Sequence, residues 1–103
     1  MNYIERAVTS VLNKRVQTSK CILVTGARQV GKSTLIKHVF PEYNRANFDD
    51  KLTRLQAKED PHLFFLNNPC PLFIDEVQKE SHILEDIKLK VDDSDERGMF
   101  ILS

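Results

Sequence analysis

The chain has 103 residues, and its fifteen Lys and Arg side chains balance fifteen Asp and Glu, so the formal net charge is zero. This length allows one domain at most, and 41% hydrophobic with 29% charged residues is ordinary for a soluble globular protein. Nothing in the sequence resembles a signal peptide or a transmembrane helix, because Glu5 and Arg6 interrupt the first residues and no apolar run is long enough. We therefore expect a cytoplasmic protein with no membrane partner.

The charges are unevenly distributed along the chain. Residues 1–45 hold eight Lys or Arg against two Asp or Glu, whereas residues 46–103 hold seven against thirteen. Two interpretations explain this distribution equally well. One is a basic half that faces phosphate, and the other is a set of solvated surfaces that have no partner. Aromatic residues do not alternate with the basic ones, so the sequence has no clear nucleic-acid signature.

Two cysteines are present, Cys21 and Cys70. Each adjoins a predicted buried strand. This position favours reduced, packed thiols over a disulfide or a pair of metal ligands.

Apolar residues at helical spacing predict an N-terminal helix from Tyr3 to about Val16. A polar linker, residues 17–20, follows it. The helix would pack on the core through an apolar stripe made of Ile4, Val8, Val11 and Leu12.

The next stretch carries the strongest functional pattern. An apolar run, residues 21–24, leads into Gly-Ala-Arg-Gln-Val-Gly-Lys-Ser at residues 26–33, and apolar residues then recur at helical spacing to Phe40. The spacing Gly-x-x-x-x-Gly-Lys-Ser between a strand and a helix is that of a phosphate-binding loop, in which backbone N–H groups and a helix N-terminus surround the phosphates. A chance match on a surface loop is the alternative, and it leaves the strand before and the helix after unexplained.

This loop predicts ATP and Mg²⁺ as cofactors. Lys32 would reach the β- and γ-phosphate oxygens as a point charge, and the Ser33 hydroxyl would supply one oxygen to Mg²⁺. Lys37 and His38 suit the negative C-terminal end of the following helix, and Pro41 stops it.

The middle of the chain predicts a short strand and two helical pieces. Residues 45–48 are weakly strand-like, with Asp49 and Asp50 at the C-terminal end of that strand. Leu52 and Leu55 suggest a helical turn or two. Another helix would begin with Asp60 as N-cap and Pro61 at its first position, end at residues 67–69, and turn Leu63, Phe64 and Leu66 inward.

A second candidate site lies where the apolar run of residues 71–74 is closed by Asp75 and Glu76. A buried parallel strand delivers its last residues to the sheet edge where the loop lies, so Asp75 would hold Mg²⁺ beside Ser33. Glu76 would orient and deprotonate the attacking water. The alternative for Glu76 alone is a solvent-facing acid in a turn.

The last third predicts a helix, a loop and a strand. Ser81 can cap the helix, whose apolar face would hold Ile83, Leu84, Ile87 and Val91 while Glu85, Asp86, Lys88 and Lys90 face solvent. The acidic run of residues 92–98 does not fit the spacing of a Ca²⁺ loop and is interpreted as solvated. Residues 99–102 predict a fourth buried strand.

Three strings resemble a family of prokaryotic AAA-type ATPases: residues 26–35, the Ile-Asp-Glu-Val-Gln of residues 74–78, and Gly-Met-Phe-Ile-Leu-Ser at residues 98–103. The resemblance covers essentially the whole chain. It implies an α/β fold, a three-layer P-loop NTPase core with a mainly parallel sheet of about four strands and helices on both faces. It also places the strand that ends at Ser103 between the loop strand and the Asp75 strand.

The resemblance implies roles for individual residues. The phosphate contacts would come from Gly26, Gly31, Lys32, Ser33 and Thr34, within a cofactor-binding loop that also contains Ala27, Arg28, Gln29 and Val30. Ser33 and Asp75 would bind Mg²⁺, and Lys32 and Glu76 would be catalytic.

Full-length members of that family continue with a fifth strand, a helical lid, usually a partner's arginine finger, and a C-terminal domain of unknown function. We therefore expect residues 1–103 to be the N-terminal part of the ATP-binding domain, with residues 1–20 as helix and linker and residues 21–103 as P-loop core. Such a piece would be weakly active or inactive. A terminal carboxylate at Ser103 would weaken ATP binding or make it more dependent on Mg²⁺. The exposed edge of the first strand would allow self-association.

Three functions stay open at this point. The first is ATP hydrolysis that drives a conformational change of unknown purpose, with ATP and ADP as ligands. The second is a nucleotide-gated interaction module with negligible turnover. The third is a P-loop kinase, although no acceptor site is visible.

Overall fold

The computed structural model describes residues 3–24 and 32–103. The elements follow one another as α1 (Tyr3–Thr18), β1 (Cys21–Leu23), α2 (Lys32–Val39), β2 (Asn44–Asn47), α3 (Lys51–Glu59), α4 (Pro61–Asn67), β3 (Leu72–Asp75), the 3₁₀ helix η1 (Val77–Glu80), α5 (Ile83–Asp92) and β4 (Phe100–Leu102). The predicted α/β class is confirmed. Loop residues 26–31, to which the sequence assigns phosphate contacts, lie outside the described residues.

The four strands form one parallel sheet in the order β1-β4-β3-β2. The expected position of the strand before Ser103 is confirmed, because β4 pairs with β1 on one side and with β3 on the other. In that register Leu102 lies opposite both Leu23 and Ile74. The three strands that adjoin the candidate site residues therefore end at the same level.

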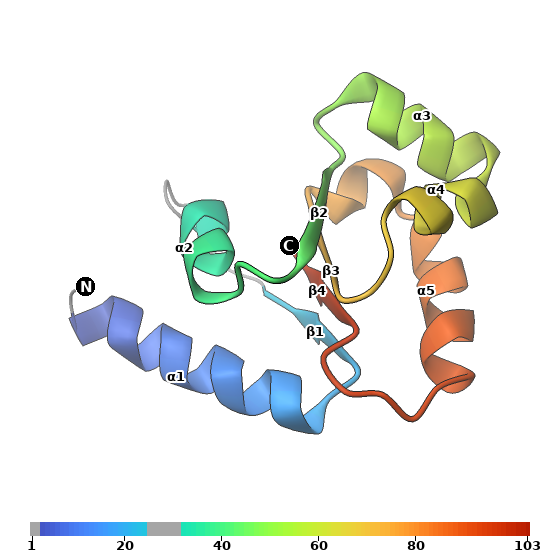
Figure 1. The fold of residues 1–103 in the computed structure, drawn as a ribbon. Coiled ribbons are helices and arrows are strands. Elements are labelled where there is room, and N and C mark those ends of the chain that lie inside the picture. The colour runs from blue at the N-terminus through green and yellow to red at the C-terminus, as the bar shows by residue number, and fades with distance from the viewer. Residues whose placement is uncertain (1–2, 25–31) are drawn as a thin grey trace.

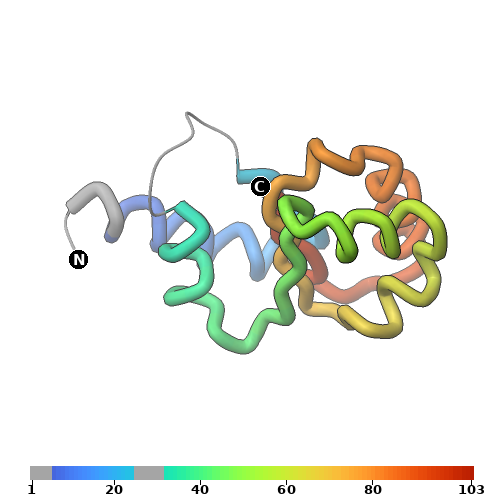
Figure 2. The backbone as a smooth tube through the Cα atoms, turned by 90° about the horizontal axis from the view of Figure 1, so that it is seen from above, coloured from blue at the N-terminus to red at the C-terminus, as the bar shows by residue number. Residues whose placement is uncertain are grey.

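Helices cover both faces of the sheet, as Figures 1 and 2 show, with α1 and α2 on one side and α3, α4 and α5 on the other. Side chains alternate between these faces along each strand. Ile22, Phe73 and Ile101 belong to the core under α1 and α2. Their neighbours Leu72, Ile74, Phe100 and Leu102 belong to the larger core on the other side.

Short-range capping explains where α3 and α4 begin. The Asp50 carboxylate accepts hydrogen bonds from the backbone N–H and the hydroxyl of Thr53, at 3.0 and 2.6 Å, and these bonds lower the pKa of Asp50. Asp60 caps α4 by accepting from the Leu63 N–H, with Pro61 at the start, as predicted. A helix is present where Leu52 and Leu55 suggested a helical turn or two, and at nine residues α3 is slightly longer than that.

Several predicted side-chain orientations were wrong. In α4, Leu63 and Leu66 are exposed whereas Phe64 and Phe65 are buried, because the two rings carry more apolar surface into the core. In α1, Leu12 is buried while Val8 and Val11 are largely exposed. In α5, the predicted inward residue Leu84 is likewise exposed.

The start of α5 also differs from the prediction. Ser81 makes no side-chain cap, because η1 runs almost directly into α5 and both Ser81 and His82 have helical backbone angles. The helix begins one residue later than such a cap requires, at Ile83.

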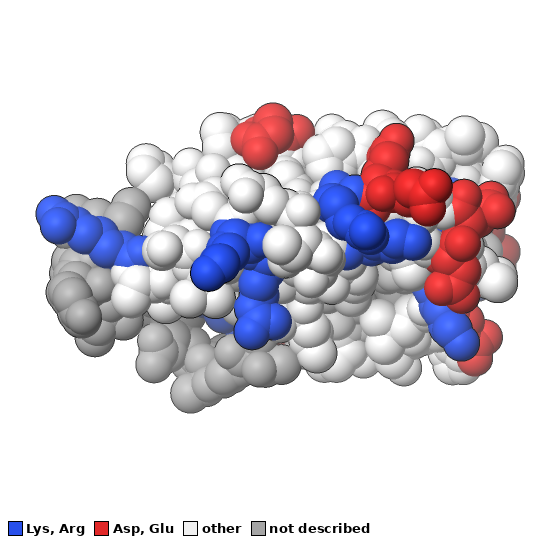
Figure 3. Space-filling view, turned by 90° about the horizontal axis from the view of Figure 1, so that it is seen from below, with Lys and Arg blue, Asp and Glu red and all other residues white. Residues whose placement is uncertain are grey.

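Both thiols are free and half-buried, and both pack against the larger core. Burial raises the pKa of Cys21 and of Cys70 above the ordinary thiol value. Within the described ranges, no helix is both long and apolar enough to cross a membrane. On one face of the molecule, most acidic side chains gather at one end, whereas basic side chains are spread along the whole face (Figure 3).

Gly98 joins the end of α1 to the start of β4. Its N–H donates to the Ser19 carbonyl at 2.8 Å, and its own carbonyl accepts a 2.6 Å hydrogen bond from the buried Tyr43 hydroxyl. Its φ is +64°, and a Cβ there would lie 2.8 Å from the Tyr43 oxygen and 2.9 Å from the Val16 carbonyl oxygen. Only glycine satisfies both the backbone conformation and the space.

We expect Gly98→Ala to lower the free energy of unfolding by about 2–4 kcal/mol, through the positive φ and the two close contacts. Urea denaturation measures this loss. The matched control is Asp95→Ala in the same loop, whose side chain is exposed, and it should change the free energy by less than about 0.5 kcal/mol. Equal stability of the two variants would contradict the assigned packing.

Candidate functional site

The carboxyl ends of β1, β4 and β3 form one edge of the sheet. The Val24 N–H donates to the Leu102 carbonyl at 2.8 Å, and the Ser103 N–H donates to the Ile74 carbonyl at 3.0 Å. The pairing thus continues one residue beyond the strands. Residues that follow the strands therefore emerge side by side at this edge, where ligands of parallel α/β sheets bind.

The Asp75 carboxylate is the centre of this edge. Its Oδ2 accepts a 2.5 Å hydrogen bond from the Ser33 hydroxyl, and its Oδ1 accepts a 2.8 Å hydrogen bond from the Ser103 hydroxyl. Side chains two residues apart along a strand face the same side of the sheet. Asp75 comes two residues after Phe73, and Ser103 comes two residues after Ile101. Both side chains therefore face α2, as Phe73 and Ile101 do. The structure thus brings together Ser33 and Asp75, which are 42 positions apart in the sequence.

The chain turns sharply after Asp75. Glu76 has φ 57° and ψ 44°, the left-handed region, and it is the one non-glycine residue with positive φ within the described ranges. The Val77 N–H donates to the Ser103 carbonyl at 2.9 Å, and the Lys79 N–H donates to the Glu76 carbonyl at 3.1 Å. These bonds hold a conformation that costs about 1–3 kcal/mol for a residue with a Cβ.

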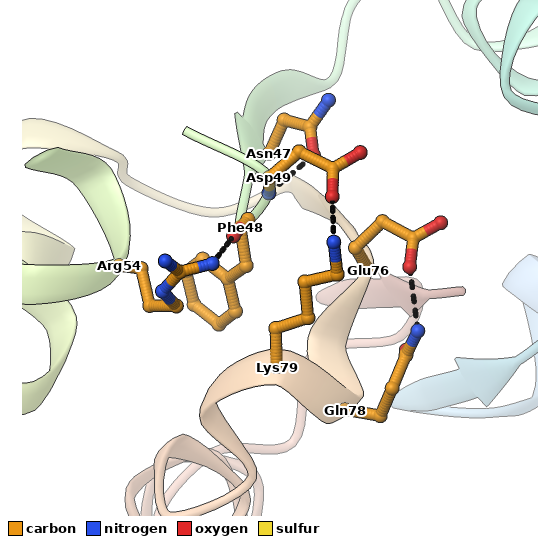
Figure 4. Close-up of polar contacts among 7 residues, drawn as sticks. All are labelled: Asn47, Phe48, Asp49, Arg54, Glu76, Gln78 and Lys79. Atoms are coloured by element: carbon orange, nitrogen blue, oxygen red, sulfur yellow. Dashed lines mark hydrogen bonds and ion pairs between the residues drawn. The ribbon is translucent and has the colours of Figure 1, made fainter. Parts of the chain in front are cut away.

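The side chains around this turn form two pairs (Figure 4). The Gln78 side-chain amide donates a 2.5 Å hydrogen bond to Oε2 of Glu76. Lys79 forms an ion pair with Asp49, which follows β2. The ion pair between Lys79 and Asp49 joins η1 to the segment that follows β2, the strand paired with β3.

The segment after β2 is fixed in turn by α3. Arg54 donates a 2.9 Å hydrogen bond to the Phe48 carbonyl, and the Asn47 side chain accepts one of 2.9 Å from the Asp49 N–H (Figure 4). Phe48 itself is fully buried. Asp49 is therefore presented to Lys79 from an anchored backbone.

A pocket of about 500 Å³ opens beside these residues. Lys32, Glu76, Gln78 and Ser103 contribute its polar wall. Its apolar wall consists of Leu23, Val24, Val77, Leu84 and Leu102, and Ser81 completes the lining. A volume of this size suits a small organic ligand.

The predicted site residues thus fall into two groups. Lys32 and Ser33 begin α2 and are half-buried, Asp75 and Glu76 end β3 and are half-buried, and Thr34 is exposed. Gly26, Ala27, Arg28, Gln29, Val30 and Gly31 lie outside the described residues.

Sequence reasoning missed two polar contacts at the site. One is the Ser103 hydroxyl on Asp75, and the other is the Gln78 amide on Glu76. Both residues of the second contact, Glu76 and Gln78, belong to the Asp-Glu-Val-Gln string, which was the available signal for it. Its geometry depends on the left-handed turn at Glu76, which the residue types do not predict.

The pair formed by Ser33 and Asp75 offers a hydroxyl and a carboxylate, and hard oxygen donors of this kind suit Mg²⁺. Among residues 3–24 and 32–103, no cluster of three or more His, Cys, Asp or Glu side chains could hold a metal. An ion at Asp75 would therefore take further oxygens from a ligand or from water. Mg²⁺ commonly binds in this way, through one or two protein groups and substrate phosphates.

Comparison with protein families gives one match. The family model described as an AAA domain matches residues 18–103, which include the four described strands and every candidate site residue. No curated protein and no solved structure matches the chain.

Proposed function

Because the chain belongs to the AAA domain family, a family of nucleotide-binding, ATPase-type domains, we propose that it binds ATP together with Mg²⁺. We further propose that the complete protein hydrolyses ATP to drive a conformational change. The 2.5 Å hydrogen bond between Ser33 and Asp75 carries the proposal, because it places the first turn of α2 against the acidic end of β3. Phosphate-binding loops need these two groups side by side.

Lys32 supplies the positive charge of the proposed site. It begins α2, lines the pocket and lies next to Ser33 in the chain. A lysine at the N-terminus of a helix neutralises phosphate oxygens together with the helix dipole. Residues 26–31 would add backbone N–H groups according to their spacing.

The donor set fits a magnesium ion. Ser33 and Asp75 would hold it, and Ser103 would keep the Asp75 carboxylate oriented by bonding its other oxygen. Such an ion would neutralise negative charge on the phosphates of the nucleotide. Asp75 is assigned the magnesium role rather than the base role, because its carboxylate lies against the Ser33 hydroxyl.

Glu76 is the proposed general base. It lines the same pocket as Lys32, so a water beside the terminal phosphate would lie near its carboxylate. Asp75 contacts Ser33 whereas Glu76 lines the pocket, so the magnesium role and the base role fall to different carboxylates.

We also propose a cytoplasmic setting and exchange of ATP for ADP. Self-association along β1 is part of the proposal, because β1 lies at an edge of the described sheet and its last residue, Leu23, is 60% exposed.

Calorimetric titration with Mg²⁺-ATP tests binding. Lys32→Ala should weaken affinity by at least about tenfold, since hydrogen bonds to charged groups contribute about 1.5–3 kcal/mol. Lys37→Ala, exposed at the other end of α2, is the matched control and should bind as the parent chain does. Equal affinity of the two variants would refute the phosphate site.

Phosphate release tests hydrolysis. Glu76→Gln should lower the rate by at least about 100-fold while Mg²⁺-ATP affinity stays within about twofold, because the amide cannot accept the water proton. Glu85→Gln on the exposed side of α5 is the control. An equally inert parent chain and variant would favour the nucleotide-gated module, and a phosphorylated acceptor would favour the kinase.

A further inference from the structure

The side chain of Gln78 adjoins the proposed base directly. Its amide nitrogen lies 2.5 Å from Oε2 of Glu76, and both residues line the pocket that contains Lys32. We infer that Gln78 is a positioning residue, whose amide holds the Glu76 carboxylate in place at the wall of the pocket. This inference rests on the proposed function.

The amide is delivered from a rigid turn. Gln78 is the second residue of η1, whose first N–H is bound by the Ser103 carbonyl. The next residue, Lys79, is tied to Asp49 by the ion pair. Figure 4 shows the Lys79–Asp49 contact, which links η1 to the segment after β2, beside the hydrogen bond between Gln78 and Glu76.

A neutral donor suits this role. A glutamate side chain has three rotatable bonds, and a base that must meet one water molecule loses rate when its position varies. The Gln78 amide restricts that freedom without placing a full positive charge on the carboxylate. A lysine or arginine at the same place would form an ion pair and make the carboxylate a poorer proton acceptor.

The opposite role for the same hydrogen bond would be inhibition. If Gln78 held Glu76 away from water, its removal would raise the rate, and the bond would break when nucleotide binds. Positioning requires a lower rate after removal and a bond that persists in the Mg²⁺-ATP complex. The two roles therefore give opposite results.

The kinetic test uses Gln78→Ala and the nearly isosteric Gln78→Glu. Both should lower kcat for ATP hydrolysis by about tenfold or more with KM within about twofold, and Gln78→Glu should lose more because it replaces the donor with a like charge. Gln17→Ala, exposed near the end of α1, is the control and should match the parent chain. An unchanged or raised kcat in Gln78→Ala overturns the inference.

A second measurement does not depend on turnover. In the ¹⁵N-labelled chain, Glu76→Ala should shift the side-chain amide signals of Gln78 and leave those of Gln17 in place. Addition of Mg²⁺-ATP to the parent chain should preserve the hydrogen-bonded signals. Unmoved Gln78 signals in Glu76→Ala, or their change to unbonded values with Mg²⁺-ATP, overturn the inference. Failure of ATP to bind, measured by calorimetry, refutes the proposed function instead.

Discussion

The parallel pairing of β4 with both β1 and β3 is the constraint on which the site depends. Phe100, Ile101 and Leu102 are all buried, so β4 offers no polar face and its register is fixed by packing on both sides. A shift of one residue would exchange the two faces of the strand. Ser103 would then point away from α2, and its hydroxyl would no longer reach the Asp75 carboxylate.

The two cores support different parts of the site. On the side of α3 to α5, a series of aromatic contacts runs from Phe48 through Phe64 and Phe65 to Phe100, with ring centroids 5.2–5.9 Å apart. This series stabilises the end of β2, which meets η1 through the Asp49 ion pair. On the other side, Ile36 and Phe40 pack against Phe73 and Ile101, and this smaller core holds α2 where Ser33 meets Asp75.

The sequence predicts what local chemistry determines. The cap at Asp60 and Pro61 is a short-range signal, and the apolar runs of β1, β3 and β4 are recognisable in isolation. The order of the strands came only from the family resemblance. The length of α3 was underestimated because Ala57 is its one buried residue, so the helix has no apolar stripe that a periodic pattern could reveal. Its capping residue Asp50 marks where it begins instead. In seven-residue α4, several apolar faces fit the spacing, and only tertiary packing selects the phenylalanines.

The proximity of Ser33 to Asp75 was predictable because a helix start and a strand end are fixed points of a parallel sheet. The position of Glu76 was not. In a continuous strand, Asp75 and Glu76 would face opposite sides of the sheet and both would lie within its ladder. The left-handed turn instead ends β3 at Asp75, starts η1 at Val77, and brings Gln78 onto the Glu76 carboxylate. Glycine would adopt this turn without strain but has no carboxylate. The backbone hydrogen bonds of Val77 and Lys79 hold Glu76 in this conformation. A strained non-glycine residue of this kind is expected where the chemistry of the side chain, rather than folding, selects the residue.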